Sequence, residues 1–502
     1  MREISTFGLL VLTVAAGAVV LLAWSQITAR LPLPGAAFFL AGAALASNLV
    51  PGAADALSIR SVERIAVVAL IVILFDGGLN VGWHRFRTAL PAIGLLGTVG
   101  TAATAGLTAT FAHYLLGFRW SLAGILGAAL APTDPAVMFS VLRGRQIGGR
   151  ASIALEGEAG INDAVAIALV VGLVEYTDAA HGSLLVVLRE FLVELGVGFA
   201  VGAAAGAVVP LLLRHARFPA EGLYGIAALA AAGLAYGAAS VAHGSGFLAV
   251  FIVGILLGAE RTPHKGEIER FSRALASFAD MAVFAALGLT IDLGILGERA
   301  IWSDGLLFAL FVVLVARPVV VLPLLARVRM RWGERLFIAW AGVKGAAPIL
   351  LAAVAVLSGF ESARMYGIVF IVVLFSVVLQ GGTVRRVADW LAIPTPRDEQ
   401  VTRAAPAAQR YHVSPASRAA GSPIRDLPLG LRGWVDEIVR DGQRRKARGR
   451  DVIRGGDRIV VTSDDEARAR RLRRLFEEPR PQSDRRPAIP GRRAGRTTQG
   501  RT

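Results

Sequence analysis

The sequence predicts an all-α polytopic membrane protein of about 13 transmembrane helices, followed by a small α/β cytoplasmic C-terminal domain. Of its 502 residues, 55% are hydrophobic and only 18% are charged, with no cysteine. Long apolar runs of this kind are membrane composition, because a soluble core cannot bury so many of them. The basic surplus lies mostly in the tail. From Arg397 onward there are 26 Lys and Arg residues against 14 Asp and Glu, within a net charge of +16.

The apolar runs follow one another with short polar loops. Predicted spans lie at 6–28, 32–50, 63–82, 89–116, 120–142, 159–177, 190–213, 220–242, 246–260, 271–291, 306–327, 336–358 and 365–384. The least certain boundary is His243 to Gly246; merging the two spans around it would give twelve. With thirteen spans, the loops on one side carry 16 basic residues and those on the other carry seven. The positive-inside rule then places the N-terminus outside and the C-terminus in the cytoplasm.

Two spans are interrupted in the middle. The fifth contains Pro132-Thr133-Asp134-Pro135, and the twelfth contains Gly342-Val343-Lys344-Gly345 followed by Pro348. Proline removes a backbone donor and disturbs the helix, so both segments are expected to unwind. The breaks are seven spans apart, which makes them equivalent if spans 1–6 and 8–13 are inverted repeats. Paired broken helices at equivalent positions indicate a transporter's binding site near the membrane midplane.

A pair of polar residues, Asn162 and Asp163, opens the apolar part of the sixth span. A carboxylate inside a membrane is costly and is usually retained for ion or proton transport. A plainer interpretation is that Asn162 caps a helix and Asp163 favours its N-terminus. In a partly dry cavity, one carboxylate holds a proton or a partly dehydrated alkali cation, but not both. If the protein rocks only when the site is neutralised, cation flow is coupled to proton counterflow.

Six motifs occur in an order that resembles one family. They are Asp76-Gly77-Gly78-Leu79, Thr133-Asp134-Pro135, Glu158 through Asp163, Gly246 through Gly258, Arg317-Pro318 and Gly342 through Ala346. Over residues 1–390 the chain resembles the NhaP branch of monovalent cation/proton antiporters, relatives of the eukaryotic sodium/proton exchangers. The resemblance implies a homodimer in which a core of crossed, broken helices packs beside an interface domain.

The resemblance also implies roles for individual residues. Asp163 corresponds to the carboxylate that binds either proton or cation, and Asn162 is typical of electroneutral exchangers. Thr133 and Asp134 correspond to residues of the unwound site, where Asp134 either stays charged and helps to bind the cation or only caps the broken helices, the second role being favoured slightly. Glu158 corresponds to a glutamate that pairs with a basic residue of the twelfth span, which here is Lys344.

The chain departs from the family pattern at two positions, and three further polar residues lie within its spans. Ala159 stands where the family usually has serine, and Lys344 stands where it usually has arginine, whose planar fork lysine lacks. Asp76 and Arg317 are predicted to support the bundle, Arg317 as a structural residue rather than a transporting one. Asp280 on the tenth span is equally explained as a packed residue, and we assign it no role.

The C-terminal part differs in kind from the rest. Residues 1–392 form the predicted membrane domain, 393–407 a linker, 408–478 a folded module and 479–502 a disordered basic tail. The module has a predicted strand and turn from Trp434 to Gly442, a turn and strand from Gly455 to Thr462, and a helix from Asp464 to Phe476. It is similar to the C-terminal RCK domain of potassium channels and transporters. Such modules dimerise and regulate transport by binding small ligands.

The sequence therefore predicts a cation/proton antiporter of the cell inner (plasma) membrane, with no cofactor and no nucleic-acid partner. Potassium is favoured over sodium because RCK modules accompany potassium handling. An RCK-regulated cation channel is the alternative, disfavoured because no carbonyl-filter motif such as Thr-Val-Gly-Tyr-Gly is present. A structural or sensory membrane protein is a third class. An enzyme is the least favoured class, because the sequence contains no nucleophile–base constellation or metal-ligand cluster.

Overall fold

The structure is a computed structural model. It describes residues 2–28, 33–49, 58–134, 137, 149–178, 184–216, 218–260, 262, 264–296, 299–360, 363–393, 407–427, 433–440, 443–447, 451–463 and 472–478. The chain forms two compact units, Met1–Thr395 and Pro396–Thr502, and each is described separately. The second proline of the first break, most of the linker, most of the helix expected from Asp464, and the basic tail lie outside the described residues.

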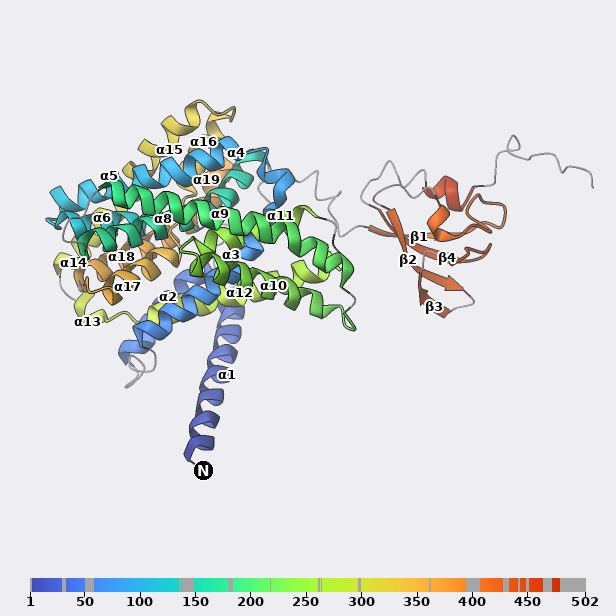
Figure 1. Ribbon diagram of the computed structural model, residues 1–502, viewed down its shortest axis with the longest axis horizontal. Coiled ribbons are helices and arrows are strands. Elements are labelled where there is room, and N and C mark those ends of the chain that lie inside the picture. The colour runs from blue at the N-terminus through green and yellow to red at the C-terminus, as the bar shows by residue number, and fades with distance from the viewer. Residues whose placement is uncertain are drawn as a thin grey trace, which may run out of the picture. The chain divides into compact units, whose positions relative to one another are not determined.

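The first unit is a helical bundle (Figure 1). Its first seven predicted spans correspond to α1 (Arg2–Thr28), α2 (Gly35–Leu49), α3 (Ile59–Phe86), α4–η2–α5 (Leu90–Tyr114), α6 (Trp120–Leu130), α8 (Gly149–Asp178) and α9 (Leu184–His215). The last six correspond to α10 (Gly222–Val241), α11 (Gly246–Ala259), α12 (Lys265–Leu289), α14–η3–α15 (Arg299–Ala326), α16 and α17 (Trp332–Trp340 and Ala347–Leu357), and α18–η4–α19 (Ala363–Trp390). A short helix, α13 (Leu293–Leu296), lies between two of them.

The prediction of thirteen spans is confirmed within the described residues. Eight helices are long and apolar enough to cross a membrane, and five shorter apolar helices occupy the remaining positions. The uncertain boundary after the eighth span is real, because α10 ends at Val241 and α11 begins at Gly246. His243 has a left-handed backbone (φ 57°), and the Ser245 hydroxyl caps α11 by accepting the Leu248 N–H at 3.3 Å.

Both predicted breaks are present, and they lie against each other. Helix α6 ends at Leu130, and residues 131–134 are not helical; residues 341–346 separate α16 from α17. The Asp134 N–H donates to the Val343 carbonyl at 2.7 Å, which joins the two unwound segments directly. Pro348 stands in the first turn of α17, where a proline starts a helix without losing a hydrogen bond.

Three π-helical segments interrupt the helices around the breaks. They are η2 (Leu95–Gly100), η3 (Val312–Ala316) and η4 (Ser376–Gly381). The first two are in the fourth and eleventh spans, which are seven spans apart, as the two breaks are; the third, in the thirteenth span, has no counterpart in α8. Such π segments are rare and occur frequently at functional sites.

Helices α3 and α11 cross closely, backbone against backbone. A Cβ atom added at Gly78 would overlap the backbone of α11, and one added at Gly254 or Gly258 would overlap the backbone of α3. Small residues permit this close approach, which is a common packing mode for helices in lipid. Helix α3 is thereby fixed against α11.

The second unit contains a four-stranded antiparallel sheet in the order β1-β4-β2-β3. The strands are β1 (Ala407–His412), β2 (Gly433–Arg440), β3 (Gln443–Lys446) and β4 (Arg458–Ser463). The two strands predicted from the sequence are β2 and β4. Asp457 is 2% exposed, and its carboxylate accepts hydrogen bonds from Arg440 at 2.7 and 2.8 Å.

The close contact of α3 with α11 can be tested with two alanine variants. We expect Gly254→Ala to lower the stability of the bundle by about 1–3 kcal/mol, since the added methyl overpacks a crossing that has no room for it. Gly237→Ala on α10 is the control, because nothing lies within 4 Å of a Cβ atom there. Thermal unfolding in detergent, followed by circular dichroism, measures both. Equal unfolding midpoints for the two variants would contradict the close crossing.

Candidate functional site

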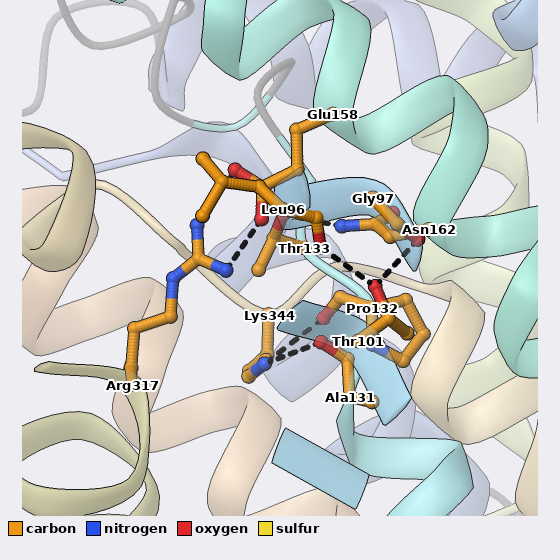
Figure 2. A network of polar contacts seen from close by, with 10 residues as sticks. All are labelled: Leu96, Gly97, Thr101, Ala131, Pro132, Thr133, Glu158, Asn162, Arg317 and Lys344. Atoms are coloured by element: carbon orange, nitrogen blue, oxygen red, sulfur yellow. Dashed lines mark hydrogen bonds and ion pairs between the residues drawn. The ribbon is translucent and has the colours of Figure 1, made fainter. Parts of the chain in front are cut away.

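The centre of the candidate site is the point where the two unwound segments meet. The Lys344 amine donates to the carbonyls of Ala131 and Pro132, each at 3.1 Å, and its side chain is 1% exposed (Figure 2). These carbonyls belong to the broken end of α6, where the helix no longer supplies donors. Inside a bilayer no water is available to donate to these carbonyls. Lys344, which belongs to the second break, therefore supplies the donor that the first break lacks.

The glycines on either side of Lys344 make room for charged side chains. A Cβ atom at Gly345 would overlap the Asp134 carboxylate, and one at Gly342 would overlap the Arg317 guanidinium. We call the point where residues 131–134 and 341–346 meet the crossing. A larger residue at either glycine position would displace a charged side chain from it. The Gly-Val-Lys-Gly segment therefore places one cation between an acidic and a basic neighbour.

Helix α8 supplies the pair that the sequence singled out. The Asn162 amide donates to the Thr133 hydroxyl at 2.8 Å, while its carbonyl oxygen is buried with no hydrogen-bond partner among the described residues (Figure 2). The structure thus brings Asn162 and Thr133 together as expected. Both side chains are almost fully buried.

Asp163 is the most unusual group in the site. Its side chain belongs to a residue only 8% exposed, yet its carboxylate forms no hydrogen bond or ion pair with any residue the structure describes. Asp134 and Lys344 are close enough to act on it electrostatically, the first as a like charge and the second as an opposite one. Buried carboxylates without partners are costly, so this one is suited to holding a proton or a cation.

Glu158 is paired differently from the prediction. Its carboxylate forms a two-pronged ion pair with Arg317, with Nη1–Oε1 and Nη2–Oε2 distances of 2.5 and 2.9 Å (Figure 2). The prediction of a Glu158–Lys344 pair is therefore wrong in its partner, because the Lys344 amine is taken up by the carbonyls of the first break. The planar guanidinium matches a carboxylate better than an amine does. The structural role predicted for Arg317 thus consists of balancing Glu158.

Two further carboxylates lie around this cluster. Asp76 on α3 accepts a hydrogen bond from Asn80 at 2.9 Å, and Asn80 in turn accepts one from Arg273 on α12 at 3.1 Å. This network joins α3 to α12, and none of its hydrogen bonds reaches the crossing. Asp280, which sequence analysis left without a role, interacts electrostatically with Asp134. No sequence motif marked it, since a single aspartate on an apolar helix is equally compatible with packing.

Crossed broken helices around an unpartnered buried carboxylate define a class of proteins, the secondary ion transporters. The sodium/hydrogen exchanger family model matches residues 16–390, and the chain belongs to this family. It is 30% identical to the K(+)/H(+) antiporter NhaP2 of Shewanella sp. (strain ANA-3), over 93% of this chain and 82% of that protein. It is 31% identical to the K(+)/H(+) antiporter NhaP of Alkalimonas amylolytica, over 79% of this chain and 71% of that protein.

The fold matches solved structures of the same group. The sodium proton antiporter MjNhaP1 from Methanocaldococcus jannaschii superposes with a TM-score of 0.64, covering 77% of this chain and 98% of that one at 19% identity. The protein is thus a multi-pass membrane protein and a monovalent cation/proton antiporter, and its family consists of transporters rather than enzymes.

The Glu158–Arg317 pair predicts a strong interaction between two mutations. Arg317→Met alone leaves a carboxylate buried without a partner and is expected to cost about 3–5 kcal/mol of stability. Glu158→Leu added to it removes that charge and should recover most of the loss. Thermal unfolding of the two singles and the double variant measures the coupling. The half-exposed pair Arg364–Asp304 is the matched control, with an expected coupling below about 1 kcal/mol. Additive losses at Glu158 and Arg317 would contradict the pairing.

Proposed function

We propose that this protein exchanges potassium ions for protons across the membrane, one for one, with Asp163 as the shared binding group. The observation that carries the proposal is the buried Asp163 carboxylate, which has no hydrogen-bonding partner among the described residues. A proton or a monovalent cation supplies the missing partner. Because both neutralise the same group, the binding of one displaces the other.

The cation would find further oxygen ligands beside Asp163. The Asn162 carbonyl oxygen has no donor among the described residues, and Asn162 is next to Asp163 in the chain. The Thr133 hydroxyl oxygen accepts a hydrogen bond from the Asn162 amide at 2.8 Å. Neutral oxygens of this kind replace the hydration shell of an alkali cation. Asp134 remains charged in this scheme, beside Gly345, and helps to attract the cation.

A single exchanging carboxylate favours electroneutral exchange. Asn162 is neutral, so one cation or one proton satisfies the pair Asn162–Asp163. Alternating access then follows if the two halves rock only when Asp163 is neutralised. The transported species are monovalent cations and protons alone, and the scheme requires no cofactor.

The choice of potassium over sodium rests on similarity. The two relatives named above are called K(+)/H(+) antiporters, whereas the structurally similar MjNhaP1 is called a sodium proton antiporter. The RCK-like reading of residues 408–478 also favours potassium. We therefore propose potassium as the preferred ion and regard sodium as the competing substrate to be measured.

The proposal also covers the orientation of the protein in the membrane, its C-terminal unit and its likeness to homodimeric exchangers. The excess of basic residues on one set of loops favours a cytoplasmic C-terminus and an external N-terminus in the plasma membrane. The C-terminal unit is proposed to be an RCK-type regulatory domain that binds a small ligand. Helix α1 exposes apolar side chains such as Leu12, Val19 and Leu22, which suit contact with lipid or with the second copy of a homodimer.

The role of Asp163 is tested by proton movement in proteoliposomes with the membrane potential clamped. Potassium or sodium gradients should drive proton flux in the wild type, with potassium more effective, and Asp163→Asn should abolish it. Asp292→Asn is the control, since Asp292 is an exposed aspartate outside the site. Undiminished exchange in Asp163→Asn would remove that residue from the coupling step. Cation flux without proton flux would point to a channel.

Competition for one site predicts a definite pH dependence. As the pH falls, protons occupy Asp163 more often, so the apparent KM for the cation should rise while the maximal rate at saturating cation changes little. Initial rates of exchange at several cation concentrations, measured at each pH, show this directly. A KM that does not vary with pH would contradict a shared site.

A further inference from the structure

Lys344 in the unwound segment and Trp340 just before it are joined to the last membrane helix by a chain of three hydrogen bonds, of which two cross to that helix and one lies within it. The Lys344 N–H donates to the Ser376 hydroxyl oxygen at 2.9 Å. The Ser376 hydroxyl donates to the Gln380 side-chain oxygen. The Gln380 amide then donates to the Trp340 carbonyl at 2.8 Å. The chain of bonds begins inside the break and ends on the last residue of α16.

The backbone groups at both ends of this chain need such partners. Trp340 ends α16, so the helix supplies no donor to its carbonyl, and Lys344 lies in the unwound segment, so no helix accepts its N–H. Ser376 and Gln380 are at most 1% exposed, in surroundings where water does not replace a lost bond. Both residues belong to the π-helical segment η4, four positions apart.

We propose that Ser376 and Gln380 are positioning residues for the transport site. They fix the backbone of the second break, and this backbone places three contacts of the crossing. These contacts are the Lys344 amine on the first break, Gly345 against Asp134, and the Val343 carbonyl that accepts the Asp134 N–H. The inference rests on the proposed function, because it assigns the two residues to the exchange site around Asp163.

A shift of the second break would reach the ion site through these contacts. Lys344 and Asp134 both act electrostatically on Asp163, so moving them changes how tightly it holds a proton or a cation. Among the described residues, neither Ser376 nor Gln380 is hydrogen-bonded to Asp163, so in this proposal they act through the backbone of the second break. Their loss should alter ion affinity and the pH profile of exchange rather than remove a ligand.

The test compares Ser376→Ala, Gln380→Met and the double variant in the proteoliposome assay. We expect each single variant to raise the apparent KM for potassium by about tenfold and to shift the pH of half-maximal exchange. The double variant should be no worse than the more affected single, because the three hydrogen bonds act as one unit. Ser376→Ala removes the fewest atoms and keeps the test available if Gln380→Met fails to fold.

Thr383→Val is the matched control on the same helix. The Thr383 hydroxyl accepts a hydrogen bond from the Trp340 indole at 3.2 Å and donates to the Leu379 and Gln380 carbonyls of its own helix, and among the described residues it makes no hydrogen bond to residues 341–346. It should leave both KM and the pH profile unchanged. The proposal is overturned if Ser376→Ala and Gln380→Met lower the unfolding temperature but keep the wild-type KM and pH profile. It is also overturned if Thr383→Val changes KM and the pH profile as they do.

Failure of the proposed function is separable from failure of this inference. If the wild type shows no potassium- or sodium-driven proton flux, the antiport scheme fails. If the wild type exchanges and Asp163→Asn does not, the scheme stands. In that case the Ser376 and Gln380 variants alone decide whether the two residues position the site.

Discussion

The hydrogen bonds from the Lys344 amine to the carbonyls of Ala131 and Pro132 are the interaction on which the site depends. A helix that stops inside a membrane leaves carbonyls without donors, and several such groups cannot be tolerated in hydrocarbon. Here the broken end of one helix is completed by a side chain from the break of another. Each break therefore depends on the other for its stability. Together they hold irregular backbone in place where the two segments meet.

The arrangement of charges around the crossing follows from this requirement. Lys344 lies among carbonyls, Asp134 lies against Gly345, and Arg317 is matched to Glu158. The formal charges of these four groups sum to zero. Asp163, by contrast, forms no hydrogen bond or ion pair among the described residues, and in the proposed scheme one proton or one monovalent cation neutralises it. Under the proposed scheme, the site binds either ion but not both at once.

Sequence alone predicted the parts of this structure that have strong local signals. Apolar runs gave the spans, and prolines and glycines gave both breaks. The Asn162-Asp163 pair stood out because nothing but apolar and small residues follows it until Glu175. Helix-breaking and charged residues inside an apolar run are strong signals, because a broken helix or a buried charge in a membrane costs free energy.

The rest depended on how helices are rotated against one another. Lys344 and Arg317 are on neighbouring spans, and both are suitable partners for Glu158 by sequence. Only the crossing geometry decides that the guanidinium reaches the carboxylate while the amine reaches the first break. The π-helical segment with Ser376 and Gln380 lies within an ordinary apolar run and carries no sequence signal. Its part in holding the break emerged from hydrogen bonds across spans.

The most direct test of the central claim is to locate the bound cation by crystallography or cryo-electron microscopy at high pH with thallium, a heavy surrogate for potassium. The account predicts one thallium ion contacted by the Asp163 carboxylate and the Asn162 carbonyl oxygen, and its loss in Asp163→Asn. An ion bound instead at Asp134 and Asp280, with Asp163 still lacking a partner, would contradict it.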